Sequence, residues 1–324
     1  MIIVTGGAGF IGSNLVYGLN LRGVFDIIIV DNLKNSIKHR NLNALKFLDF
    51  VDKRYFIENL SKFKKAEVIF HQGACSNTME TDGYYMINNN YEYSKTILHH
   101  CITNNIRLIY ASSASVYGNG LHGFSEKPES EYPLNIYAFS KYLFDNYVRM
   151  YFERGKLCYK SFKKKSTQIV GLRYFNVYGP QENHKNTMAS TIFHFYNQII
   201  KENKMKLFEG SENFLRDFVY VDDIVKINLF FYEKEDLNGI FNCGTGKAES
   251  FLKIAKILQN FNTNSDIEYI PFPDQLKGKY QTYTCADLTL LRNSGYIGDF
   301  TSLEEGIKKY YYYLKENGGY LTKG

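Results

Sequence analysis

The sequence predicts an α/β protein with a Rossmann-type, doubly wound parallel sheet and a smaller C-terminal α/β lobe. Short apolar runs alternate with longer segments of helical character, which is the pattern of a parallel sheet covered by helices. A glycine-rich turn follows the first apolar run directly. With 324 residues, of which 44% are apolar and 22% charged, the chain is long enough to bury a full-sized core and to carry an appended lobe.

The expected strands are short apolar runs that come from both halves of the chain. Helices are expected at 13–21, at 137–149 and near 187–202. The later strands suggest that the first lobe recruits distant parts of the chain. In order, the strand-like segments are 2–4, 27–30, 68–70, 107–111, 168–174, 218–221, 240–242 and 267–270.

Composition excludes several classes of protein. No apolar run approaches the roughly 20 residues that cross a bilayer, and the chain opens on a strand-like Ile2-Ile3-Val4, so we expect a cytoplasmic protein without membrane association. Five widely spaced cysteines predict neither a disulfide framework nor a metal site. A net charge of +6 suits nucleic acid or a small anionic substrate, but we interpret the densest basic run, 160–165, as a solvated loop and expect no nucleic-acid partner.

The glycine-rich turn predicts a dinucleotide-binding loop. Its spacing is Gly6-x-x-Gly9-x-x-Gly12, with a strand-like segment before it and a helix-like segment after it. Glycines let the backbone turn sharply and approach a pyrophosphate, and the following helix offers its N-terminal N–H groups to the anion.

The second predicted strand ends in Asp31, where a carboxylate would meet the ribose of the adenosine half. Asp31 alone favours NAD. Asn32, Lys38 and Lys53 instead suit the additional 2′-phosphate of NADP. These residues leave the choice between the two cofactors open.

A second motif carries acid/base chemistry. The strand at 107–111 leads into Ser112-Ser113, and Tyr137-x-x-x-Lys141 opens the next helix with both side chains on one face. An ammonium beside a phenol is expected to favour the phenolate, which takes a proton from an alcohol as hydride leaves the carbon for nicotinamide. Ser113 would hold the same oxygen with a second hydrogen bond. The motif therefore predicts a hydride-transfer enzyme.

From about residue 176 the texture of the sequence changes. Gly-Pro, Asn and His-containing loops surround the expected helix near 187–202, and Pro271-Phe272-Pro273 follows a strand-like segment. We place the substrate-binding lobe here. The predicted division is discontinuous, with 1–175 plus about 217–247 in the dinucleotide-binding domain and about 176–216 plus 248–324 in the substrate-binding domain.

The glycine turn, Asp31, Ser113 and Tyr137-x-x-x-Lys141 together resemble the extended short-chain dehydrogenase/reductase family of nucleotide-sugar enzymes over nearly the whole chain. Within that family the chain is similar to epimerases that act on an ADP-linked heptose. Gln72 and Thr187 stand where those relatives have Glu and Ser. The segments that carry this closer resemblance are 71–76, 173–180, 184–185, 208–211 and 216–221.

The resemblance implies an activity, a cofactor and an assembly. The activity is inversion of C6 of ADP-D-glycero-D-manno-heptose through a transient 6-ketone, for the lipopolysaccharide core. The cofactor is one tightly bound NADP per subunit. The assembly is a homo-oligomer, expected to be a pentameric ring. The nearest rival is a 4-epimerase of the same family, whereas a 4,6-dehydratase would carry an Asp-Glu pair in place of Ala114-Ser115.

The resemblance also implies roles for individual residues. Lys185 would be a second acid/base that serves one stereoisomer while Tyr137 serves the other. Around the cofactor it implies Gly6, Gly9, Phe10, Ile11, Gly12, Asp31, Asn32, Lys38, Lys53, Gln72, Gly73, Ala74, Cys75, Ser76, Asn89, Tyr137, Lys141, Val177 and Lys185. On the substrate it implies Ser113, Asn176, Thr187, His194, Phe208, Glu209, Gly210, Ser211, Arg216 and Tyr280.

Several of these residues have plain alternatives. Lys185 would also suit simple anion binding, and His194 a place in the core. Arg216 matches a diphosphate, yet Asp217 and Asp223 are candidate partners for it. The side chain of Tyr280 could serve packing alone. The rival from another functional class is a catalytically silent dinucleotide-binding regulator or RNA-binding relative, and the intact Ser-Tyr-Lys set argues against it.

Overall fold

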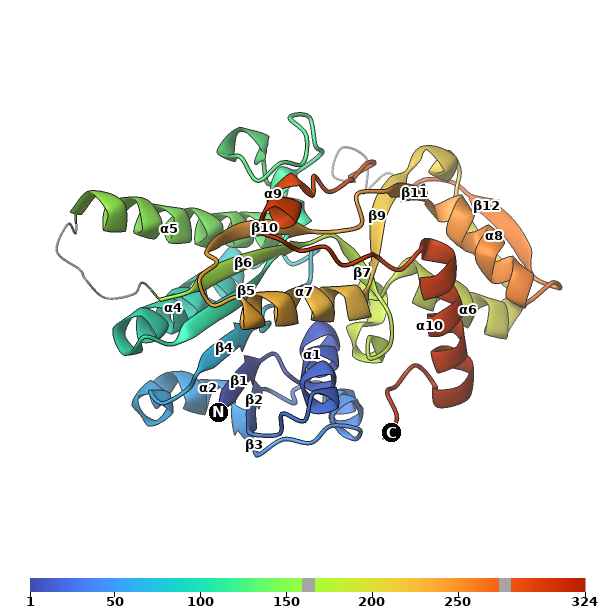
Figure 1. Ribbon diagram of the computed structural model, residues 1–324. Coiled ribbons are helices and arrows are strands. Elements are labelled where there is room, and N and C mark those ends of the chain that lie inside the picture. Colours follow the sequence, from blue (N-terminus) through green and yellow to red (C-terminus); the bar gives the residue numbers. More distant parts are fainter. Residues whose placement is uncertain (159–166, 274–280, 324) are drawn as a thin grey trace.

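The structure, a computed structural model that describes residues 1–158, 167–273 and 281–323, is built around a seven-stranded sheet (Figure 1). Its strands run parallel in the order β10-β6-β5-β4-β1-β2-β3. The order reverses between β1 and β4, and a ligand crevice forms at such a reversal, beside the carboxyl ends of the strands. The strands are β1 (Ile2–Thr5), β2 (Ile27–Asp31), β3 (Asp49–Asp52), β4 (Val68–His71), β5 (Arg107–Ser113), β6 (Ile169–Tyr174) and β10 (Gly239–Cys243).

Helices cover both faces of this sheet because successive residues of a buried strand point to opposite sides. In β1, Ile2 and Val4 belong to the core formed with α1 and α7, whereas Ile3 belongs to the core formed with α4 and α5. A π-helical stretch, Ile87–Glu92, joins α3 to α4. The helices are α1 (Phe10–Leu21), α2 (Lys53–Glu58), α3 (Gly83–Met86), α4 (Tyr93–Asn104), α5 (Ile136–Cys158), α7 (Val221–Glu233) and α9 (Thr289–Asn293).

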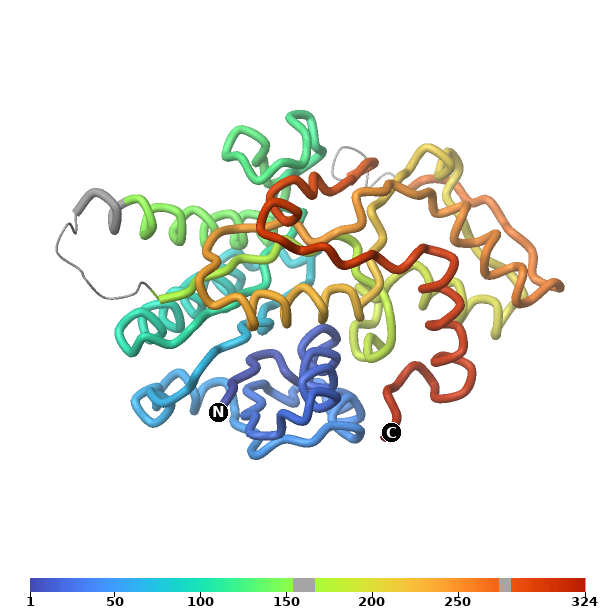
Figure 2. Tube along the Cα trace, in the orientation of Figure 1, coloured from blue at the N-terminus to red at the C-terminus, as the bar shows by residue number. Residues whose placement is uncertain are grey.

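Two small sheets, β11-β9-β7 and β12-β8, lie beside the large sheet with a separate core in which Phe218 and Tyr220 meet Ile192, and this region is called the second lobe below. After α10 the chain returns toward the first lobe (Figure 2). There the guanidinium of Arg40 lies 4.0 Å from the ring centroid of Tyr320. The elements are β7 (Asn176–Tyr178), β8 (Lys204–Phe208), β9 (Leu215–Tyr220), β11 (Ala248–Ser250), β12 (Asp266–Ile270), α6 (Thr191–Glu202), α8 (Phe251–Phe261) and α10 (Leu303–Asn317).

Short helical turns carry several loops of the molecule. Most are single 3₁₀ turns. The 3₁₀ segments are η1 (Ser36–Leu42), η2 (Leu60–Phe63), η4 (Ala114–Tyr117), η5 (Pro128–Ser130), η6 (Asn183–Met188) and η7 (Ser211–Asn213). Within the described residues, the structure contains no helix that combines the length and the apolar character needed to span a membrane.

The predicted doubly wound sheet is confirmed, but one of its expected strands belongs elsewhere. The segments at 168–174 and 240–242 form β6 and β10 of the large sheet. The segment at 218–221 was wrongly assigned to that sheet, because β9 pairs with β7 and β11 instead. The helix near 187–202 begins only at Thr191, where Ser190 caps it by accepting the N–H of Phe193. The basic run at 160–165 lies outside the described residues, and the division into two domains stays a prediction.

Candidate active site

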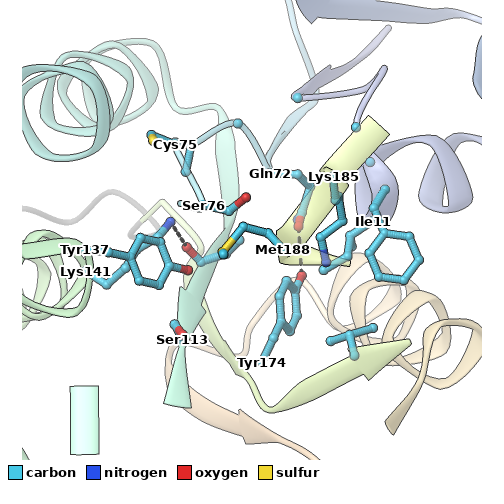
Figure 3. Close-up of a pocket in the computed structure, with 18 of the residues that line it drawn as sticks. Ile11, Gln72, Cys75, Ser76, Ser113, Tyr137, Lys141, Tyr174, Lys185 and Met188 are labelled. Atoms are coloured by element: carbon cyan, nitrogen blue, oxygen red, sulfur yellow. Dashed lines mark hydrogen bonds between the residues drawn. The ribbon is translucent and has the colours of Figure 1, made fainter. Parts of the chain in front are cut away.

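The carboxyl ends of β1, β2, β4 and β5 open into a cavity of about 600 Å³ (Figure 3). All residues predicted to hold the cofactor lie on its wall, together with Ser113 and Asn176. One cavity therefore joins the glycine turn to the Ser-Tyr-Lys set. The predicted residues on the wall are Gly6, Gly9, Phe10, Ile11, Gly12, Asp31, Asn32, Lys38, Lys53, Gln72, Gly73, Ala74, Cys75, Ser76, Asn89, Ser113, Tyr137, Lys141, Asn176, Val177 and Lys185.

The glycine turn forms a cradle that side chains would fill. Gly6 has a φ of +67°, and a Cβ there would lie 2.6 Å from the backbone nitrogen of Gly73. A Cβ at Gly12 would lie 2.2 Å from the carbonyl oxygen of Gly6. Gly9 is the N-cap of α1, whose first turn has no acidic residue. The N-terminus of α1 is thus open to an anion such as a pyrophosphate, and the site fits a dinucleotide.

Positive charges gather where the adenosine half of a dinucleotide would lie. The Nζ of Lys38 lies 2.5 Å from the Oδ1 of the buried Asp31, and Lys53 Nζ donates a hydrogen bond to Asn89 Oδ1 at 2.6 Å. Burial lowers the pKa of Lys53, and the charges of Arg54 and Lys38 act in the same direction, partly offset by Asp31. An anion bound beside Lys38 and Lys53 would relieve this repulsion. A phosphate group of a bound dinucleotide would meet that requirement.

The Ser-Tyr-Lys set meets at the end of β5. Ser113 is the last residue of β5, and Tyr137 and Lys141 lie in the first turns of α5. Lys141 Nζ donates a hydrogen bond to the carbonyl oxygen of Ala111 at 2.8 Å, which ties α5 to the strand. Burial lowers the pKa of Lys141 to about 8, against the attraction of Asp145 one turn further along α5.

The pKa of Tyr137 lies above its ordinary value in this structure. Burial raises the pKa of Tyr137, and it outweighs the opposing effect of the hydrogen bond with Ser113. Removing a phenol from water disfavours its charged form, which explains the direction of this effect. Tyr137 is therefore a neutral phenol at neutral pH in this structure.

A buried polar cluster supports the set from behind. The carboxylate of Asp145 accepts hydrogen bonds from Arg173 Nε at 2.9 Å and from Ser112 Oγ at 2.8 Å. The hydroxyl of Tyr110 donates to its other oxygen at 3.0 Å. Asp145 and Arg173 are both fully buried. Buried charges persist only when they are paired and hydrogen-bonded, so this cluster holds the end of β5 firmly against α5.

Lys185 reaches the cavity from η6. Its Nζ lies 5.0 Å from the ring centroid of Phe10 and 3.7 Å from Oε2 of the buried Glu182. Burial lowers the pKa of Lys185, while Glu182 opposes this effect. Figure 3 shows Lys185 and Tyr137 on opposite sides of the cavity, with Met188 between them in that view. A group able to exchange a proton is thus present on each side.

Most residues expected to bind the substrate lie in the second lobe, beyond the cavity wall. His194 is half-buried on α6, with Nε2 3.4 Å from the carbonyl oxygen of Thr187, so a place in the core is wrong for it. Gly210 has a φ of +78° and precedes the buried Ser211. Phe208 is the last residue of β8, and Glu209 follows it. Tyr280 lies outside the described residues.

Arg216 is buried, whereas its alternative role, an ion pair with Asp217 or Asp223 on the surface, would leave it in solvent. It is 5% exposed, and its guanidinium lies 5.9 Å from the ring centroid of Phe251. The carboxylate of Asp217 accepts the N–H groups of Thr245, Gly246 and Ala286. Asp223 accepts hydrogen bonds from Lys226 and from Thr301. Each aspartate is thus held by hydrogen bonds from other segments, and Arg216 itself donates a hydrogen bond to the carbonyl oxygen of Leu215 at 3.3 Å.

The cavity also contains residues that sequence reasoning missed. Tyr174 donates its hydroxyl to Gln72 Oε1 at 3.0 Å, and its place at the end of β6 was the available signal. Thr78 donates to the sulfur of Met188 at 3.6 Å, from a loop distant in sequence, which no local pattern indicates. The remaining missed residues on the wall are Thr5, Val30, Tyr85, Tyr93, Ala111, Ser112, Ala114, Ser115, Phe175, His184 and Gln281.

Comparison with known proteins gives consistent results. Residues 2–244 match the sequence model of the NAD dependent epimerase/dehydratase family. ADP-L-glycero-D-manno-heptose-6-epimerase of Brachyspira hyodysenteriae is 59% identical over 325 residues, covering 99% of this chain and 100% of the relative. The crystal structure of the Helicobacter pylori enzyme of the same name has a TM-score of 0.83 and 28% identity, covering 97% of this chain and 96% of that one. UDP-N-acetylglucosamine 4-epimerase from Methanobrevibacter ruminantium also reaches a TM-score of 0.83, with 26% identity over 98% of both chains.

Proposed function

We propose, from the premise that the chain belongs to the NAD dependent epimerase/dehydratase family, that it is an isomerase that converts ADP-D-glycero-D-manno-heptose to ADP-L-glycero-D-manno-heptose by inverting C6. The observation that carries the proposal is the 59% identity to a heptose epimerase over the whole chain. Ser113, Tyr137 and Lys141 on one cavity wall supply the chemistry that this reaction needs. The product would enter the lipopolysaccharide core.

The chemistry follows from the placement of these side chains. A dinucleotide held by the glycine turn would supply the hydride chemistry, oxidation at C6 followed by reduction on the other face of the ketone. Tyr137 would remove the proton of the C6 hydroxyl, and Ser113 would hold the same oxygen. Lys141, fixed by the carbonyl of Ala111, would place positive charge beside the oxygens as they become negative.

Inversion calls for a second acid/base, and we assign this role to Lys185. The ketone must present both faces, so one fixed group is poorly placed for one of the two half-reactions. Lys185 lies across the cavity from Tyr137 (Figure 3). Burial lowers the pKa of Lys185, which increases the fraction of neutral amine that can accept a proton.

The substitution Lys185→Met is expected to lower kcat for epimerisation by about 100-fold, because one half-reaction loses its acid/base. The shape of the side chain is largely kept, so KM should change little. Epimerisation is measured with each pure epimer as the starting substrate. If Lys185→Met and Tyr137→Phe each leave epimerisation near that of the wild type, the two-base proposal is wrong. Loss with Tyr137→Phe alone would indicate one shared acid/base.

We further propose that the cofactor is NADP, held tightly with one molecule per subunit. The support is the meeting of Lys38 and Lys53 beside Asp31, whose own charge is already paired with Lys38. A 2′-phosphate would accept charge-assisted hydrogen bonds from Lys38 and Lys53, whereas a free 2′-hydroxyl carries no negative charge to pair with them.

The substitution Lys53→Gln tests the cofactor proposal. It keeps a hydrogen-bond donor for Asn89 but removes the charge, so affinity for NADP⁺ should fall by about tenfold while affinity for NAD⁺ stays nearly unchanged. Binding of each cofactor to stripped protein is measured by calorimetry. Lys34→Gln, at an exposed lysine of the neighbouring loop, is the matched control. Equal losses for both cofactors would contradict the proposal.

The second lobe would bind the ADP-heptose. A buried guanidinium at Arg216 suits a diphosphate, and Thr187, His194 and the segment 208–211 lie in the same lobe. The family resemblance also supports a cytoplasmic homo-oligomer, which we propose to be a pentamer. Sedimentation of the purified protein tests that assembly.

The decisive experiment incubates purified protein with ADP-D-glycero-D-manno-heptose, without added cofactor, and follows the C6 proton by NMR. Conversion to the L-glycero epimer is expected, and the cofactor is then identified after denaturation. The equal TM-score to a 4-epimerase makes inversion at C4 of a UDP-sugar the second candidate. Turnover of UDP-glucose or UDP-N-acetylglucosamine, with none of the heptose, would replace the first proposal with the second.

A further inference from the structure

Ser115 donates two hydrogen bonds to the hydroxyl oxygen of Ser113, which determines how the Ser113 hydroxyl can bond to other groups. The Oγ of Ser113 accepts the backbone N–H of Ser115 at 3.2 Å and the hydroxyl of Ser115 at 2.9 Å. A serine hydroxyl has two lone pairs and one hydrogen. Both lone pairs of Ser113 are therefore occupied, and it can make a further hydrogen bond only as a donor.

The remaining hydrogen of Ser113 is available to the oxygens of the cavity that Ser113 shares with Tyr137. The hydrogen bond between the two side chains lowers the pKa of Tyr137, which is the effect of a donor on a phenolate. Ser113 and Tyr137 also line the same cavity, so an alcohol oxygen bound beside Tyr137 lies within reach of the same donor.

The turn that carries Ser115 is held rigidly. Val116 and Tyr117 are buried, and the hydroxyl of Tyr117 donates to Asn242 Oδ1 at 2.6 Å. The N–H of Tyr132 donates to the carbonyl of Val116 at 2.9 Å. Ser115 is thus placed by the packing of its neighbours before any substrate binds, which is the condition for an effective supporting contact.

We propose that Ser115 is a positioning residue that makes Ser113 an obligatory hydrogen-bond donor to the oxygens on which negative charge develops. The inference rests on the proposed function. In the oxidation step the hydroxyl proton of the sugar would pass to the phenolate form of Tyr137 and the hydride of C6 to the oxidised nicotinamide. In the reduction step the same hydride would return to the carbon, and the ketone oxygen would regain a proton from Lys185 or Tyr137. Ser113 donates throughout, and neither serine gains or loses a proton.

The contact could instead serve only the local fold, since Ser113 caps the turn η4 through the N–H of Ser115. The substitution Ser115→Ala separates the two roles. Alanine keeps that backbone N–H and the cap, and it removes only the hydroxyl that occupies the second lone pair of Ser113. Ser115→Thr restores a hydroxyl at the same position.

The kinetic test compares these variants in the holoenzyme. Ser115→Ala should lower kcat by about fivefold, with KM within about twofold of the wild type. The rise of kcat with pH should move to higher pH, because Tyr137 loses part of its stabilised phenolate. Ser115→Thr should restore both. Ser125→Ala, which removes a comparable serine pair with Ser130 outside the cavity, should change neither.

A second measurement does not depend on turnover. With ¹³C-labelled tyrosine, the Cζ resonance of Tyr137, assigned from its loss in Tyr137→Phe, should move in Ser115→Ala and stay in place in Ser125→Ala. An unmoved resonance, or an unmoved pH profile with unchanged kcat, would overturn the inference. A shifted resonance in a protein that turns over no ADP-heptose would support this inference and contradict the proposed function.

Discussion

Tyr137→Phe is expected to lower kcat for epimerisation by about 1,000-fold, with KM within about threefold of the wild type. The phenol is the group placed to exchange the proton of the reacting alcohol, whereas the ring would still fill the same space. Tyr137 is a neutral phenol at neutral pH in this structure, so it must lose its own proton before it can accept that of the substrate, and phenylalanine has no hydroxyl for either step. The measurement is the rate at which each C6 epimer is converted by the variant.

The matched control for this experiment is Tyr142→Phe. Tyr142 lies on the same helix, packs 6.1 Å from the ring centroid of Phe139 and is not part of the cavity wall. Its substitution should leave kcat unchanged. Thermal unfolding of both variants checks that neither change disturbs the fold. Epimerisation by Tyr137→Phe at a rate close to that of Tyr142→Phe would remove the phenol from the proposed mechanism.

The parts of the fold that sequence reasoning predicted correctly are those with strong local signals. Ile2–Thr5, followed by Gly6-x-x-Gly9-x-x-Gly12, combines a buried strand with a turn that only glycines fit, since a Cβ at Gly6 or Gly12 would meet the backbone. Asp31 marks the end of a strand buried on both faces. Such segments show their structure without reference to the rest of the chain.

The parts that it missed depend on tertiary partners. β3 (Asp49–Asp52) and β11 (Ala248–Ser250) are short, half-exposed strands that become strands because a neighbour is available for pairing. The segment at 218–221 looks like a strand of the large sheet, but Phe218 and Tyr220 are buried in the second lobe. Periodicity indicates that such a segment is a strand and not which sheet it joins.

The same limit applies to the site. Ser113, Tyr137 and Lys141 form a motif with a fixed spacing, so their common location was predictable from the sequence. The contact between Thr78 and Met188, by contrast, joins two loops that have no common pattern. Only the structure shows that the pKa of Tyr137 is raised, because the burial of the phenol, which sets this direction, cannot be determined from the sequence motif.

Lys141→Met is expected to stabilise the cofactor-free protein at pH 7 while lowering kcat by about 100-fold or more. Burial lowers the pKa of Lys141 to about 8, from an ordinary value of 10.5. Between these two pH values the unfolded chain holds a proton that the native protein has released, so native stability rises with pH in that window. Below pH 8 both states are protonated, and the native state bears the full cost of a buried ammonium.

The size of this cost sets the expected result. The lowering of the pKa of Lys141 corresponds to about 3 kcal/mol of native stability lost at pH 7. Methionine loses the hydrogen bond to the carbonyl of Ala111, which contributes about 1 kcal/mol. The free energy of unfolding should therefore rise by about 2 kcal/mol at pH 7. Urea unfolding at pH 7 and pH 10 measures it, with the exposed Lys64→Met as the control. The gain should shrink at pH 10, where the lysine of the native protein is already neutral. If Lys141→Met destabilises the protein equally at both pH values, Lys141 stabilises the fold. The proposed energetic cost of burying its charge would then be wrong.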